Sequence, residues 1–100
     1  MKLGIVGLGL IGGSLGLDAR ALGHGVVGVS RKFSTCQRAV ERGVVDDASV
    51  DLSILSTVDV VILCTPLSDI LATTAKILPF LPKTCILTDV GSVKDRKSVV

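Results

Sequence analysis

The sequence predicts an α/β fold, in which a doubly wound parallel sheet has strand order 3-2-1-4-5 and helices on both faces. The first observation is the order of elements, because short apolar runs alternate with segments of helical periodicity along the chain. The second is composition, since 48% of the 100 residues are apolar and only 2% are aromatic. A core of Val, Ile, Leu and Ala is typical of parallel strands covered by helices on both sides. We expect residues 1–100 to form one domain.

The first half of the chain alternates predicted strands and helices. The strands are Leu3–Val6, Val26–Val29 and a short Val44–Val45, and the helices are Leu10–Leu22, Ser34–Arg42 and a short Val50–Leu55. The first helix presents one apolar face at helical spacing, made by Ile11, Leu15, Ala19 and Leu22. Gly23 is a natural stop for that helix, as Gly43 is for the second. Ser34 followed three residues later by Gln37 predicts a capping box at the start of the second helix.

The second half of the chain adds two predicted strands and two helices. The strands are Val58–Cys64 and Thr84–Thr88, and the helices are Leu67–Leu78 and a last one that starts at Ser92. Pro79 and Pro82 lie just beyond the first of these helices, as expected for a helix end. The whole order reads βαβαβ and then αβαβα, and right-handed crossovers between parallel strands convert it into the predicted open sheet.

A glycine-rich loop joins the first strand to the first helix. The stretch Gly7-Leu8-Gly9-Leu10-Ile11-Gly12 matches G-x-G-x-x-G, a pattern typical of dinucleotide binding when a strand precedes it and a helix follows. Gly7 would allow a tight turn, Gly9 would let a pyrophosphate approach the backbone, and Gly12 would let the helix pack closely. The start of the helix favours the negative pyrophosphate. The alternative is a glycine turn that only packs.

The end of the second strand indicates which dinucleotide the loop would bind. A carboxylate at that point would bind the ribose 2′-hydroxyl of NAD, but the strand runs into Ser30-Arg31-Lys32 without one. Ser30 can donate to a 2′-phosphate, Arg31 can pair with it and stack on the adenine, and Thr35 can add a hydroxyl. The sequence therefore favours NADP, and the alternative is an ordinary solvated basic turn.

Other polar candidates follow the carboxyl ends of the fourth and fifth strands, where ligands bind in this topology. The backbone of Cys64-Thr65-Pro66 could line the nicotinamide ribose, or could form a plain strand-to-helix turn. Asp89 and Ser92 follow the fifth strand. Spacing alone favours Ser92 as a helix N-cap, supported by Asp95 at capping-box distance.

Several functional classes find no support in the sequence. His24 precedes the second strand, so it lies at the amino edge of the sheet and is a poor candidate for a catalytic base. It is the only histidine, and no metal-ligand pair has the right spacing, so we expect no metal site. A net charge of +2 and few aromatic side chains argue against a nucleic-acid partner, and the N-terminal apolar run is too short for a membrane span. Three cysteines without pair spacing (Cys36, Cys64 and Cys85) indicate reduced thiols of a cytoplasmic protein.

Four segments together resemble the nucleotide-binding domain of the prephenate/arogenate dehydrogenase family of tyrosine biosynthesis. They are "KLGIVGLGLIGGSL", "GVSRKFSTCQRAVERGVVD", "VILCTPL" and "LTDVGSVK", and the likeness covers essentially the whole chain. The glycine loop alone is common to many dehydrogenases, whereas "GLIGGSL" with "DVGSVK" at the matching distance is far more specific. The likeness is greatest to the cyanobacterial, NADP-dependent arogenate dehydrogenases, and it implies a Rossmann domain.

The resemblance implies a role for each matching residue. The pyrophosphate would be held by Gly7, Gly9, Leu10, Ile11 and Gly12, the 2′-phosphate by Ser30, Arg31 and Thr35, and the nicotinamide would be bordered by Cys64, Thr65 and Pro66. Ser92 matches a serine that assists at the ring hydroxyl of the substrate, a catalytic role compatible with capping.

The family reaction is an oxidative decarboxylation, in which arogenate or prephenate gives hydride to NADP⁺ and loses carbon dioxide. By the resemblance, the catalytic histidine and a helical domain for substrate and homodimer contacts follow residue 100. The sequence leaves open which of the two substrates is used. It also leaves open two other functions: a stand-alone nucleotide-binding module, and the nucleotide domain of a 3-hydroxyisobutyrate or 6-phosphogluconate type dehydrogenase, against which "DVGSVK" argues.

Overall fold

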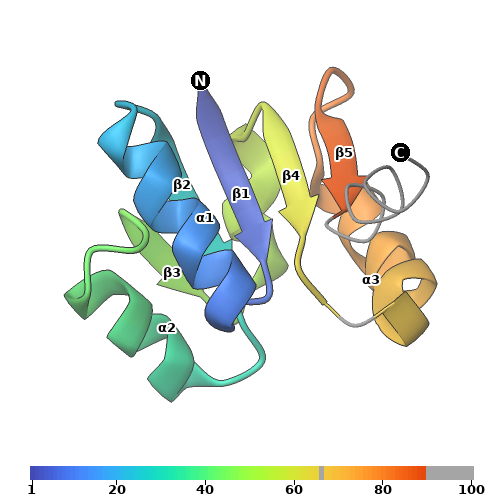
Figure 1. Cartoon of the computed structure of the whole chain (residues 1–100). Helices are drawn as coiled ribbons and strands as arrows, with labels where there is room; N and C mark the ends of the chain where they lie inside the picture. Colours follow the sequence, from blue (N-terminus) through green and yellow to red (C-terminus); the bar gives the residue numbers. More distant parts are fainter. Residues whose placement is uncertain (66, 90–100) are drawn as a thin grey trace, which may run out of the picture.

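The computed structural model describes residues 1–65 and 67–89, and these contain one sheet of five parallel strands (Figure 1). The strands are β1 (Lys2–Val6), β2 (Gly25–Val29), β3 (Asp47–Ser49), β4 (Val60–Leu63) and β5 (Ile86–Asp89). Their order across the sheet is β3-β2-β1-β4-β5, and each neighbouring pair is parallel. The predicted fold class and strand order are therefore confirmed.

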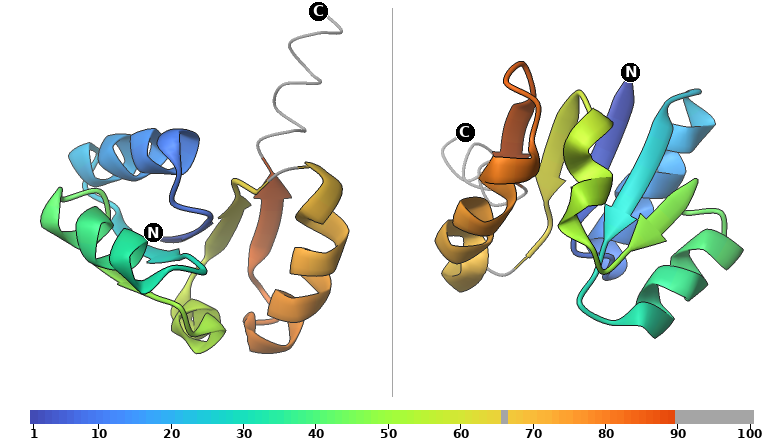
Figure 2. Two further views of the ribbon diagram at one scale, coloured as in Figure 1. Left: turned by 90° about the horizontal axis from the view of Figure 1, so that it is seen from below. Right: turned by 180° about the vertical axis from the view of Figure 1, so that it is seen from behind.

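Helical segments connect the strands and cover both faces of the sheet. The α-helices are α1 (Leu10–Ala21), α2 (Phe33–Glu41) and α3 (Ile70–Ile77), and the 3₁₀ segments are η1 (Leu52–Thr57), η2 (Leu67–Asp69) and η3 (Leu78–Phe80). Helices α1 and α2 lie on one face of the sheet, and α3 lies with η1 on the other (Figure 2). None of the helices in the described part of the chain has the length and apolar character that a membrane span requires.

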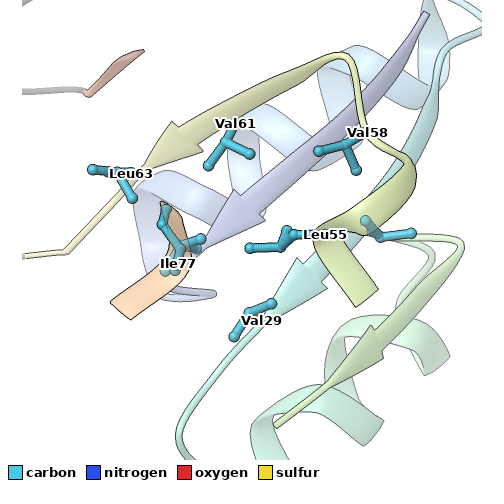
Figure 3. Close-up of a cluster of buried hydrophobic side chains, with 8 residues drawn as sticks. Val29, Leu55, Val58, Val61, Leu63 and Ile77 are labelled. Atoms are coloured by element: carbon cyan, nitrogen blue, oxygen red, sulfur yellow. The ribbon is translucent and has the colours of Figure 1, made fainter. Parts of the chain in front are cut away.

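Two apolar clusters hold the layers together, one on each face of the sheet. Toward α1 and α2, the fully buried Ile5 of β1 packs with Ala19 and Ala39 of these helices. Toward η1 and α3, Leu55 and Ile77 are completely buried against the strands (Figure 3). Burial of a large side chain such as Ile5, Leu55 or Ile77 contributes about 1.5–3 kcal/mol to stability. These clusters therefore hold the strands and the loops that follow them in place.

The third strand does not lie where the sequence predicted it. Val44 and Val45 are buried, but they precede the strand, which is formed by Asp47–Ser49. The apolar pair belongs to the cluster under α1 and α2, and a Cβ on Gly16 of α1 would meet Val44 Cγ1 at 2.7 Å. Their apolar character reflects this packing, whereas β3 is a three-residue edge strand that tolerates polar residues.

The helix ends match some signals in the sequence and contradict others. Gly23 and Gly43 follow α1 and α2 with φ of +89° and +73°, which confirms both predicted stops. Leu22 was predicted on the buried face of α1 but is 76% exposed, because it is the C-cap, where the helical path ends. The predicted capping box at Ser34 is wrong, since α2 starts one residue earlier and its N-cap is Lys32, which makes no side-chain cap.

The other predicted helices change in type or length. The short helix expected at Val50–Leu55 is the 3₁₀ segment η1, whose N-cap Asp51 accepts a hydrogen bond from the Ser53 amide at 2.9 Å. The helix expected at Leu67–Leu78 is divided among η2, α3 and η3. Pro79 has no N–H to continue the α-helical bonds, so the α-helix ends at Ile77 and a 3₁₀ turn follows. The last predicted helix, from Ser92, lies outside the described residues.

Candidate functional site

The candidate site lies at the carboxyl edge of the three central strands. Val6, at the end of β1, is in register with Val29 of β2 and Leu63 of β4, so the three following loops leave the sheet side by side. The Gly7 amide donates to the Val29 carbonyl at 2.9 Å, and the Cys64 amide donates to the Val6 carbonyl at 2.8 Å. These bonds fix the loops on the rigid sheet edge where open α/β sheets bind ligands.

Two of the glycines in the first loop are required by the protein's own packing. Gly7 has φ of +97°, and a Cβ there would lie 2.9 Å from the Cys64 carbonyl oxygen. A Cβ on Gly12 would collide with the Gly7 carbonyl oxygen and lie 3.2 Å from Ile5 Cγ2. A turn that only packs would explain both of these glycines.

Gly9 differs from these two, because a Cβ built on it would meet nothing within 4 Å. Its φ of −79° is also accessible to other residues. Gly9 is the N-cap of α1, and it has no side chain to occupy the free amides of the first turn. Packing gives no reason for glycine here, whereas an anion close to the backbone at the helix start would.

One pocket at this edge lies between α1 and α2, and we call it the α1–α2 pocket. It has a volume of about 620 Å³. Polar residues and glycines line it from the start of α1, from the turn after β2, and from α2 with its C-cap. These residues are Gly9, Gly13, Ser14, Ser30, Thr35, Arg38 and Arg42. No carboxylate is among the described residues that line it. The predicted Ser30 and Thr35 thus share one pocket with the glycine loop.

The second pocket, the strand-end pocket, lies on the other side of Ser30 and has a volume of about 540 Å³. Its polar lining residues and its glycine are Gly7, Ser30, Arg31, Lys32, Thr65, Asp69, Thr73 and Lys76. Ser30 is half-buried and lines both pockets, whereas Arg31 is exposed and lines only this one. The Ser30 hydroxyl accepts a hydrogen bond from the Lys32 amide at 3.3 Å, which orients its oxygen at the turn.

Thr65, in the loop after β4, has a buried Oγ1 atom without a hydrogen-bond partner among the described residues. A buried hydroxyl without a partner costs roughly 1–3 kcal/mol, so a ligand that reaches this pocket would gain by bonding to it. The neighbouring Cys64 is half-buried, and burial raises the pKa of its thiol, which keeps it neutral. Pro66 of the same predicted group lies outside the described residues.

Some of the remaining predicted residues lie in the described part of the chain, and others lie outside it. Leu10 and Ile11 begin α1, as expected for the amides that would face a pyrophosphate. Asp89 ends β5 in register with Leu63, at the same edge of the sheet. Ser92, the predicted catalytic residue, lies outside the described residues. His24 immediately precedes β2, at the opposite edge, as the sequence predicted.

Three cations that line the pockets from α2, its C-cap and α3 were not predicted from the sequence. Arg38 and Arg42 line the α1–α2 pocket, and Lys76 lines the strand-end pocket. A signal was available for the first two, since they follow Thr35 by three and seven residues, a spacing that puts all three on one helix face.

Comparison with known proteins supports a dehydrogenase nucleotide domain. The family model "Prephenate dehydrogenase, nucleotide-binding domain" matches residues 15–99. The crystal structure of arogenate dehydrogenase from Synechocystis is 56% identical, with a TM-score of 0.88 over 90% of this chain and 32% of that one. Prephenate dehydrogenase from Aquifex aeolicus, in complex with hydroxyphenyl propionate and NAD⁺, is 24% identical with a TM-score of 0.82, over 89% of this chain and 32% of that one.

More distant dehydrogenases share the fold. The 3-hydroxyisobutyrate dehydrogenase of Mycobacterium tuberculosis is 20% identical with a TM-score of 0.77, over 88% of this chain and 30% of that one. A comparison with curated protein sequences gives no match. The chain spans about a third of the length of the dehydrogenases with which it superposes.

Proposed function

Because the chain belongs to the prephenate dehydrogenase family and matches its nucleotide-binding domain, we propose that it binds NADP and serves an arogenate or prephenate dehydrogenase. The observation that carries the NADP assignment is the turn after β2. Ser30 and Thr35 face the glycine loop across a pocket whose described lining has no carboxylate, and Arg31 flanks the same turn. A dinucleotide with a 2′-phosphate suits this arrangement, whereas NAD is typically bound through an acidic residue at that point.

The residues present fit such a cofactor. Gly9 and the first amides of α1 would receive the pyrophosphate, because no Cβ or capping side chain blocks them. The buried Thr65 hydroxyl would bond to the part of the cofactor that enters the strand-end pocket. The Aquifex aeolicus relative, which carries NAD⁺, shares this fold and supports a nicotinamide cofactor in general.

We propose that the complete protein is an oxidoreductase that acts on arogenate or prephenate in tyrosine biosynthesis in the cytoplasm. The 56% identity to an arogenate dehydrogenase favours arogenate. When bound, NADP⁺ would supply the hydride acceptor. The residues described here would hold and orient it, and Ser92 would assist at the substrate hydroxyl. Substrate contacts, the proton acceptor and the contacts of a homodimer are proposed to come from a region matching the remaining two thirds of the relatives.

The test is a calorimetric titration of the chain with NADPH and NADH. The wild type is expected to bind NADPH more tightly. Arg31→Ala should weaken NADPH binding by about 1.5–3 kcal/mol, the range for a hydrogen bond to a charged group, and should leave NADH nearly unchanged. Gly9→Val should abolish binding of both, while circular dichroism shows a folded protein, because a Cβ at this position meets nothing within 4 Å.

Two results would contradict the proposal. Equal losses of NADPH and NADH affinity in Arg31→Ala would remove the 2′-phosphate assignment, and retained affinity in Gly9→Val would mean that the loop only packs. Turnover of arogenate and prephenate by the complete protein is a separate measurement. If the protein binds the cofactor but turns over neither substrate, it is a nucleotide-binding module, and the proposed dehydrogenase activity is refuted.

A further inference from the structure

We propose that Arg38 is a further specificity-determining residue, which pairs with the 2′-phosphate of NADP from the side opposite Arg31. This inference rests on the proposed function, since it concerns the cofactor assigned there. It starts from Ser30, which lines both pockets. Arg31 lines only the strand-end pocket, and Arg38 lines only the α1–α2 pocket. A phosphate bound at the Ser30 hydroxyl would therefore have one guanidinium on each side.

The position of Arg38 on α2 brings its side chain to this pocket. Thr35, Arg38 and Ala39 share the helix face that lines the pocket, and Ala39 is buried against the core on the α1 side. Ala39 thus fixes which face of α2 turns inward. Arg38 is exposed at the rim beside it, so its long stem can extend along the pocket while the guanidinium stays accessible to a ligand.

No group in the described part of the chain neutralises the charge of Arg38. Among residues 1–65 and 67–89, no carboxylate pairs with Arg38 or Arg42, and neither side chain donates a hydrogen bond. Arg20 behaves differently, since its Nε lies 3.1 Å from Asp46 Oδ1 and its Nη1 donates to the Gly43 carbonyl at 2.6 Å. Arg20 is thus a structural residue. Two guanidiniums that lack partners among the described residues, in a pocket whose described lining has no carboxylate, make an environment that attracts an anion.

Distance along the helix separates the roles of the two arginines. Arg38 follows Thr35 by three residues, about 4.5 Å along the axis, which is within reach of a phosphate held by Ser30 and Thr35. Arg42 follows Thr35 by seven residues, about 10 Å along the axis, and is already the C-cap of α2. Arg38 can therefore bond directly to the phosphate, whereas Arg42 adds only to the longer-range potential.

The test compares ligands with and without the 2′-phosphate. The chain carrying Arg38→Gln is titrated with NADPH, NADH, 2′,5′-ADP and 5′-AMP. We expect roughly tenfold weaker binding of NADPH and of 2′,5′-ADP, as for the loss of one charge-assisted hydrogen bond, and less than about twofold change for the other two. Arg38→Lys keeps the charge without the planar fork and should give an intermediate loss.

Two control variants remove a positive charge elsewhere. Arg42→Gln should give a smaller loss than Arg38→Gln, one that disappears at high salt because it acts through the screened potential. Lys83→Gln changes an exposed lysine before β5, at the opposite edge of the sheet, and should leave all four affinities unchanged. Circular dichroism and thermal unfolding verify that each variant folds, which is expected because Arg38, Arg42 and Lys83 are all exposed.

The outcomes separate this inference from the proposed function. If the wild type prefers NADPH and Arg38→Gln keeps that preference in full, the inference about Arg38 is wrong and the NADP assignment stands. Equal losses for NADPH and NADH in Arg38→Gln would likewise overturn it, since the effect would not involve the 2′-phosphate. If the wild type has no preference for NADPH, the NADP assignment fails, and the Arg38 inference fails with it.

Discussion

A pair of neighbouring glycines in α1 offers a direct test of how the glycine loop is packed. Gly12 and Gly13 are consecutive residues of the same helix, so alanine should improve the helical propensity of each by about 1 kcal/mol. Their surroundings differ. A Cβ on Gly12 would collide with the Gly7 carbonyl oxygen and press on Ile5, whereas a Cβ on Gly13 would meet nothing within 4 Å.

The expected difference in stability follows from these contacts. The Gly7 carbonyl belongs to a loop whose amide is bonded to Val29, so it cannot move aside without breaking the strand-end bonds. Overpacking of this kind costs typically 1–3 kcal/mol, which outweighs the gain in helical propensity. We expect Gly12→Ala to lower the free energy of unfolding by about 1 kcal/mol or more and Gly13→Ala to raise it by about 0.5–1 kcal/mol. The two variants should therefore differ by about 2 kcal/mol.

The measurement is thermal or urea unfolding of the ligand-free chain, followed by circular dichroism. For a domain of 100 residues, a difference of about 2 kcal/mol corresponds to roughly 10 °C in Tm. If Gly12→Ala were as stable as Gly13→Ala, α1 could not approach the Gly7 carbonyl as closely as the structure has it. Packing would then not explain why residue 12 is a glycine. Greater stability of both variants than of the wild type would have the same meaning.

Two further substitutions test interactions outside the pockets. Asp46→Ala removes the exposed ion pair with Arg20 (3.1 Å) and the hydrogen-bond acceptor of the Val26 amide (2.8 Å). It should lower the free energy of unfolding in urea by about 1–2 kcal/mol, mostly because the Val26 amide loses its partner. Asp46→Asn keeps an acceptor and should lower the free energy of unfolding clearly less. The hydrogen bond from the Ser53 amide lowers the pKa of Asp51 below 3.8, so its contribution is present above that value and is lost as the pH falls through the lower, folded pKa. A series of Tm values between pH 6 and pH 2 should therefore fall less steeply in Asp51→Asn than in the wild type, and parallel curves would contradict this cap.

Much of the fold could be predicted because hydrophobic periodicity and handedness rules act locally. The β1, β2 and β4 strands are apolar runs between glycine or helical segments, and right-handed crossovers then allow few strand orders. Val44 and Val45 misled the prediction because an apolar pair is equally compatible with a buried strand and with a buried turn. Only the packing of that turn against Gly16 of α1 distinguishes the two.

The candidate site was predictable to the extent that it lies on loops next to strand ends. The glycine pattern and the basic turn at Ser30 are contiguous in sequence, and the strand register brings them to one edge. Arg38 is different, because its place in the pocket depends on which face of α2 turns toward α1. Helical spacing groups Arg38 with Thr35 on one face of α2, but only the burial of Cys36 and Ala39 turns that face toward the pocket.

The residues around Ser30 also indicate what would determine the proposed preference for NADP over NAD. NAD is typically recognised by a carboxylate at the end of the second strand, which bonds to the ribose 2′-hydroxyl. A carboxylate introduced at position 30 in this chain would lie between Arg31 in one pocket and Arg38 in the other. Either guanidinium could pair with this carboxylate. A carboxylate paired in this way is less able to accept a hydrogen bond from the ribose 2′-hydroxyl. The proposed preference for the 2′-phosphate would thus depend on the cations that flank the turn from both sides as well as on the absence of an acid, and a change to NAD would require their removal too.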